Sequence, residues 1–189
     1  DGSRRVLVGI NDSGVDDTHP DLAPNFDAAN SVNCTANGVA DRTEGAWRQT
    51  TSAHGTHVAG TAGGFGVNAD GSTFTGDYSK LTPETVAQMR IGPGTAPKSL
   101  LYAIKVFGCD GSTNVVSEAL DWALDPDRDG DPTDKLDLVN LSLGSDFGAP
   151  DDPDSLFVRK LAANNVLPVF SGGNGGDRYD VGGSPGNTP

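Results

Sequence analysis

The chain has 189 residues, of which 35% are hydrophobic and 21% charged, and its formal net charge is −13. This length and apolar content suffice for one domain with a sizeable core, and the 26 glycines and 12 prolines indicate many loops. The negative charge argues against a nucleic-acid partner, because phosphates bind to basic surfaces. No run of about 18 apolar residues occurs, so we expect no membrane span.

Four short apolar runs predict buried parallel strands, because they are rich in Val, Ile and Leu and do not alternate cleanly with polar residues. These runs are residues 6–10, 100–107, 136–143 and 166–170. Helical patterns lie between them: "HVAGTAGGF", "STNVVSEALDWAL", in which Ser112 is placed to cap the helix, and "DPDSLFVRKLAANN". Strands that alternate with helices predict an α/β fold, a three-layer αβα sandwich around a mainly parallel sheet.

Residues 65–99 interrupt this alternation. They form a long insertion rich in Gly, Thr and Pro, with one weak helical pattern at "PETVAQM". In sheets of this kind, functional groups gather beyond the carboxyl ends of the strands. The segments that follow the four runs, 12–14, 108–112, 142–144 and 171–176, are therefore expected to meet at one edge.

Two histidines, His54 and His57, open the first helical pattern. At this spacing they could hold zinc, but a zinc helix usually carries its pair four residues apart with a Glu between. Here Gly and Thr lie between them, and His19 is the only other histidine. A general base and a pair of structural histidines are the alternatives.

Asp12, Ser13 and Gly14 follow the first strand run. An apolar run that ends in Asp-Ser-Gly also occurs in aspartic proteases, which need two such aspartates and an all-β fold. This chain has one, and its pattern is rich in helices. An isolated Asx-turn at the end of a strand is the structural alternative.

Five motifs in order resemble those of the subtilisin-like serine peptidases, the subtilases. "INDSGVDDTHPDL" is similar to the aspartate motif of that family, and "HGTHVAGT" to its histidine motif. "LYAIKVFGCDGS" and "LDLVNLSLG" resemble the two strands that line its substrate cleft. "VLPVFSGGNGG" resembles the strand that precedes its oxyanion-hole asparagine. The resemblance covers nearly the whole chain outside the 65–99 insertion and implies a subtilisin-like fold.

The resemblance implies a role for each matching residue. His54 is the general base, Asp12 orients it, and Asn174 donates to the oxyanion. Backbone groups of Gly111 and Ser112 on one side, and of Ser142, Leu143 and Gly144 on the other, pair with an extended substrate peptide. It implies a secreted serine endopeptidase that acts on proteins and has no organic cofactor.

The family's nucleophile segment is absent from the matched motifs. Only Ser184 follows Asn174 among the serines, and "GGSPG" does not resemble the family's Gly-Thr-Ser-Met-Ala type segment. We therefore interpret residues 1–189 as the N-terminal portion of a catalytic domain, inactive alone, whose remainder is its partner. The 65–99 loop is most similar to the group with an inserted protease-associated domain. The alternative is a non-catalytic pseudoprotease or calcium-binding scaffold.

An acidic loop, "DPDRDGDPTD", spans residues 125–134. Asp125, Asp127 and Asp129 alternate and a glycine follows, as in the opening of an EF-hand loop, so they predict a calcium site. The glutamate at the twelfth position is missing, and Asp131 or Asp134 could replace it. A solvated acidic turn is the alternative.

The two cysteines, Cys34 and Cys109, allow one intrachain disulfide. The family resemblance implies secretion, where thiols oxidise, and thus predicts that they pair. Two free thiols are the alternative.

Overall fold

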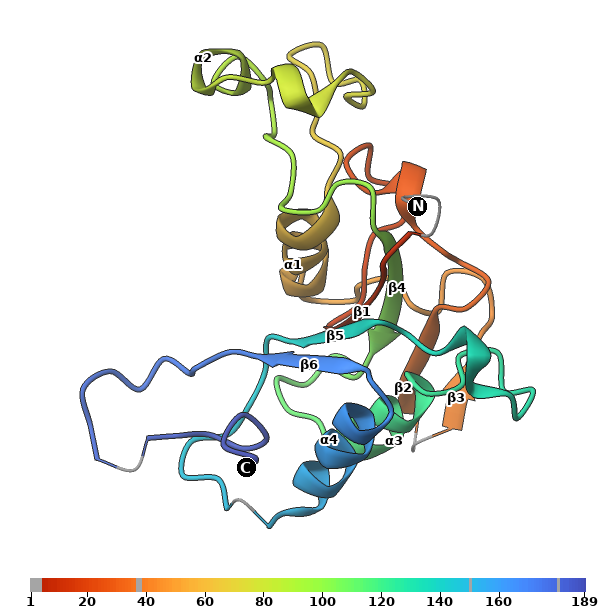
Figure 1. The fold of residues 1–189 in the computed structure, drawn as a ribbon, viewed down its shortest axis with the longest axis vertical. Coiled ribbons are helices and arrows are strands. Elements are labelled where there is room, and N and C mark those ends of the chain that lie inside the picture. The colour runs from red at the N-terminus through yellow and green to blue at the C-terminus, as the bar shows by residue number, and fades with distance from the viewer. Residues whose placement is uncertain (1–4, 37–38, 150, 180) are drawn as a thin grey trace.

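The computed structural model describes residues 5–36, 39–149, 151–179 and 181–189. Six strands form one sheet in the spatial order β3-β2-β4-β1-β5-β6 (Figure 1). Neighbouring strands are parallel except for the antiparallel pair β2 and β3. The predicted α/β class with a mainly parallel sheet is therefore confirmed. The strands are β1 (Leu7–Asp12), β2 (Val32–Ala36), β3 (Val39–Asp41), β4 (Leu100–Lys105), β5 (Leu138–Leu141) and β6 (Leu167–Phe170).

Helices cover both faces of this sheet. Helix α1 (His54–Gly63) lies on one face, and α3 (Val116–Trp122) and α4 (Pro153–Ala163) lie on the other (Figure 1). Two buried clusters fill the space between the layers, a smaller one under α1 and a larger one under α3 and α4. None of the helices in the described ranges combines the length and the apolar run that a bilayer crossing requires.

Short elements complete the secondary structure. Three 3-10 turns are η1 (Ala23–Asn25), η2 (Tyr78–Lys80) and η3 (Pro132–Asp134). Helix α3 begins later than the sequence suggests, and the predicted cap at Ser112 is wrong. Val115 is the residue before the helix, and its N–H donates to the Thr113 hydroxyl instead.

The insertion at 65–99 leaves the end of α1 and returns to the start of β4, with the short helix α2 (Pro83–Val86) at its far end (Figure 1). Asp21 fixes the first residues of this insertion. The Asp21 carboxylate accepts the N–H of Gly66 at 2.6 Å, and the Asp21 carbonyl accepts the N–H of Phe65 at 2.8 Å. Burial raises the pKa of this carboxyl group, which is 3% exposed.

The predicted disulfide is wrong in this structure, because both cysteines are free. Cys34 lies on β2 and is 2% exposed, within the core cluster that α3 and α4 cover. Cys109 is exposed in the loop after β4. Burial raises the pKa of Cys34 to about 11, so this thiol is an inert core side chain.

Candidate active site

Asp12 and His54 meet at the carboxyl end of β1. The Nδ1 atom of His54 lies 2.8 Å from Oδ1 and 2.9 Å from Oδ2 of Asp12. Asp12 is 1% exposed, whereas the side chain of His54 is 54% exposed. Because two carboxylate oxygens face Nδ1, we assign the ring hydrogen to this nitrogen, which leaves Nε2 as the acceptor. The arrangement can orient an imidazole and stabilise its protonated form.

The residues next to Asp12 and next to His54 pack closely against one another and fix this contact. Ser13 donates its hydroxyl to the Ser52 carbonyl at 3.0 Å and accepts the Gly55 N–H at 3.0 Å. A Cβ atom on Gly55 would lie 2.4 Å from the Gly14 carbonyl oxygen. Gly14 itself has φ of +99°, which a residue with a side chain rarely adopts. The close approach of α1 to the end of β1 therefore requires Gly55, whereas the positive φ requires Gly14.

A cleft of about 520 Å³ runs beside His54. Its walls come from the segments after β4 and β5, which is the edge where the sequence places the functional groups. All five predicted substrate-binding residues line it together with His54: Gly111, Ser112, Ser142, Leu143 and Gly144. The two backbone segments thus face one hollow that could hold an extended peptide.

Asn174 lies after β6, in a second hollow of about 520 Å³. Ser142, Leu143 and Gly144 line both hollows, so the hollow at Asn174 adjoins the cleft that His54 lines. The structure thus brings Asn174 to the same edge of the sheet as Asp12, although it does not place Asn174 and His54 in one cavity.

Ser184 does not occupy the position of a nucleophile. It is 4% exposed, its hydroxyl donates to the Asp152 carboxylate, and its backbone pairs with Ser145. Within the described ranges, no serine hydroxyl hydrogen-bonds to the ring of His54. The contact between Asp12 and His54 is therefore present, and a serine that hydrogen-bonds to the His54 ring is not among the described residues.

His57 does not form a metal site with His54. It lines a separate hollow of about 620 Å³ on the flank of α1, together with His19 and residues 91–95 of the insertion. In the part of the chain that the structure describes, the acidic loop is the one group of three or more side chains close enough to share a metal ion. The structure does not support the zinc alternative.

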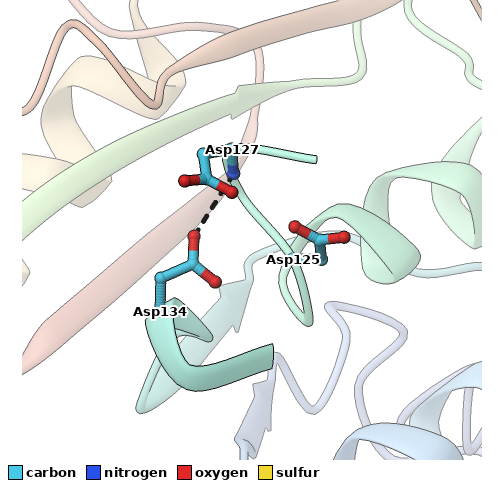
Figure 2. Close-up of side chains that lie close together, drawn as sticks. All are labelled: Asp125, Asp127 and Asp134. Atoms are coloured by element: carbon cyan, nitrogen blue, oxygen red, sulfur yellow. Dashed lines mark hydrogen bonds between the residues drawn. The ribbon is translucent and has the colours of Figure 1, made fainter. Parts of the chain in front are cut away.

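The acidic loop brings together Asp125, Asp127 and Asp134, with ligand atoms within 4.8 Å of one another (Figure 2). Asp125 and Asp127 of the predicted set belong to this group, and Asp129 does not. The Asp129 carboxylate instead accepts the N–H of Asp131 at 2.7 Å. Asp134 takes its place because η3 folds back over the loop, where the N–H of Asp127 donates to the Asp134 carboxylate at 3.3 Å.

Two oxygens in this group lack the bonds that buried polar atoms normally make. Oδ1 of Asp125 and Oδ1 of Asp134 are both inaccessible to solvent and have no hydrogen-bond partner among the described residues. Burial raises the pKa of Asp134, and the neighbouring carboxylates of Asp127 and Asp125 add to this shift. Crowded oxygens without donors fit a hard cation such as calcium, which binds carboxylate oxygens.

A buried aspartate in contact with a histidine, beside a cleft at the carboxyl edge of a parallel sheet, is an arrangement that nucleophilic hydrolases use. The family comparison agrees with this class. A model of the Subtilase family, Peptidase_S8, matches residues 3–189, and the chain belongs to this family. The resemblance that the motifs indicate is thereby confirmed.

Relatives share the fold and a modest part of the sequence. The minor extracellular protease Vpr of Bacillus subtilis (strain 168) is 31% identical over 187 residues, which are 97% of this chain and 19% of that protein. Subtilisin of Bacillus pumilus is 29% identical over 90% of this chain and 48% of its own length. Among solved structures, the S41 psychrophilic protease has a TM-score of 0.71 at 27% identity and sphericase has 0.70 at 26%.

The chain spans only part of these relatives. It covers 50% of the S41 psychrophilic protease and 51% of sphericase, while 96% and 98% of its own residues are matched.

The tight contact of Gly55 predicts an unusual substitution effect. Alanine is usually favoured over glycine in a helix by up to about 1 kcal/mol. We expect Gly55→Ala instead to lower the free energy of unfolding by about 1–3 kcal/mol, because its Cβ overlaps the Gly14 carbonyl. Gly172→Ala is the control, since a Cβ there meets no atom within 4 Å. Equal stability of the two variants in denaturant titrations would contradict this packing.

Proposed function

We propose that the full-length protein is a secreted serine endopeptidase and that Asp12 and His54 are two members of its catalytic triad. The observation that carries the proposal is the contact between His54 Nδ1 and the buried Asp12 carboxylate at 2.8 Å. In the proposed reaction, Nε2 of His54 takes the proton of a serine hydroxyl as that oxygen attacks the peptide carbonyl. Asp12 keeps the ring in place and stabilises the imidazolium that forms.

The remaining site residues have supporting roles in this proposal. Asn174 donates its side-chain amide to the oxyanion of the tetrahedral intermediate, which in comparable sites is worth about 3–4 kcal/mol. Backbone groups of Gly111 and Ser112 and of the 142–144 segment pair with the substrate as added strands. Their common position along one cleft with His54 supports this path for the peptide.

The serine itself is proposed to lie outside residues 1–189, in the remainder of the same catalytic domain. Two observations support this: Ser184 is engaged with Asp152, and the chain matches about half of sphericase. In this proposal the isolated chain is inactive. The Vpr relative is an extracellular protease by name, which supports a secreted location.

Substitution of His54 tests the proposed triad. We expect His54→Ala in the full-length protein to lower kcat by about 10⁴-fold or more, because triad residues act as a unit. His57→Ala is the matched control, one turn further along α1 and on the flank of another hollow, and should retain activity within a few-fold. Near-normal turnover of His54→Ala would contradict the triad. A wild-type protein that cleaves no peptide would favour the pseudoprotease or scaffold alternative.

We also propose that the acidic loop binds calcium through Asp125, Asp127 and Asp134. The orphaned buried oxygens of Asp125 and Asp134 carry this proposal. A bound calcium ion would neutralise the charge of these carboxylates. It would also link Asp134 of η3 to Asp125 and Asp127, which follow α3. The ion's role would be structural, because the loop is not part of the cleft that His54 lines.

Calcium titration with two aspartate variants tests the ligand set. At a calcium concentration about 100-fold above Kd, the wild type should gain about 2.7 kcal/mol of stability. Asp127→Ala should abolish the rise in Tm, whereas Asp129→Ala should keep most of it, because Asp129 lies outside the cluster. A response that is lost in Asp129→Ala and kept in Asp127→Ala would reverse the assignment, and no response in any variant would leave a solvated acidic turn.

A further inference from the structure

Lys105 is a buried cation beside the proposed active site. It is the last residue of β4, and 2% of its surface is exposed. In the sheet register its Cα is the partner of the Asp12 Cα on β1, so the two side chains leave the same face of adjacent strands. Burial lowers the pKa of Lys105. Within the described ranges, no carboxylate lies at ion-pair distance from its ammonium group.

Such a group needs an explanation, because a buried charge without an ionic partner is costly to fold. The ammonium group of Lys105 donates a hydrogen bond to the backbone carbonyl of Arg48 at 2.8 Å. Arg48 belongs to the segment 47–53, which runs directly into His54 at the start of α1. Its guanidinium group also pairs with Asp17, with N–O distances of 2.5 and 3.1 Å. Lys105 therefore holds the backbone at a fixed point of this segment.

The other end of the same segment is held from β1. Ser13, the residue after Asp12, donates its hydroxyl to the carbonyl of Ser52. Between these two points, the Thr50 hydroxyl donates to the Gly108 carbonyl at 3.2 Å. An apolar side chain in place of Lys105 would fill the space at no desolvation cost but would leave the Arg48 carbonyl without its donor. The hydrogen bond to the Arg48 carbonyl thus explains why a lysine is buried here, whereas packing alone would be satisfied by an apolar side chain.

We propose that Lys105 is a positioning residue of the active site, whose ammonium group holds the 47–53 segment so that His54 meets Asp12. The assignment rests on the function proposed above. Lys105 acts through the backbone of Arg48 and does not itself contact the substrate or the reacting atoms.

The test compares Lys105→Met with Lys80→Met in the full-length protein. We expect Lys105→Met to lower kcat by about 10- to 100-fold with KM within about twofold, because a small displacement of a catalytic group slows the chemical step and leaves binding intact. Its stability should stay close to that of the wild type, since removal of a buried charge offsets the lost hydrogen bond. Lys80 is exposed on the insertion and pairs with Asp77, so its variant should keep wild-type kinetics.

A conservative variant separates a positioning role of Lys105 from a general loss of stability. Lys105→Arg keeps the charge and the donors and should recover most of the lost kcat. If Lys105→Met does not fold, Lys105→Leu, which likewise lacks a donor, carries the same comparison. An unchanged kcat in a folded variant, or a fall in kcat that only parallels a loss of stability, would overturn the assignment.

Failure of the proposed function would be recognised separately, as a wild-type protein without peptidase activity. The role of Lys105 is then read from the ring of His54 by NMR. Lys105→Met should speed the exchange of the Nδ1 proton with water, because the bond to Asp12 is loosened. Exchange at the wild-type rate would overturn the positioning role whatever the activity.

Discussion

A buried carboxylate determines where the rest of this site must lie. Asp12 is 1% exposed, and a charge in such surroundings is tolerated only when its oxygens are hydrogen-bonded. Oδ1 accepts the N–H of Ser13 at 2.7 Å, and both oxygens face the ring of His54. In a low-dielectric environment these bonds are stronger than in water, and a missing one costs more. The imidazole is thereby held in one orientation and one tautomer before any substrate arrives.

The fold meets this constraint by bringing distant segments to one edge of the sheet. β1 ends in Asp12 and lies between β4 and β5, whose following loops form the walls of the cleft. The carbonyl of Asp12 also accepts the N–H of Val106 at 2.8 Å, which extends the ladder to the end of the strand. The neighbouring residue Asn11 is in an unfavourable environment. It is fully buried, and its side-chain amide has no hydrogen-bond partner among the described residues. Functional sites commonly tolerate such local conflicts.

The sequence predicted what depends on local pattern and missed what depends on pairing in space. The four apolar runs and the helix after His54 could be recognised because Val, Ile and Leu cluster or recur along one face. β2 and β3 could not, since "VNCTA" and "VAD" carry little apolar pattern and are strands only through their neighbours. The choice of Asp134 over Asp129 likewise follows from η3 folding back, and the burial of Cys34 from the packing of β2 under α3.

The most direct test of the central claim is the protonation of the His54 ring, read from its nitrogen resonances by ¹⁵N NMR of the folded protein with neutral imidazole. The contact with Asp12 predicts a hydrogen on Nδ1 and none on Nε2. Nδ1 lies 2.8 and 2.9 Å from two carboxylate oxygens, which can only accept, so Nδ1 must be the donor. Resonances of a ring protonated on Nε2, or averaged between the two tautomers, would contradict the account.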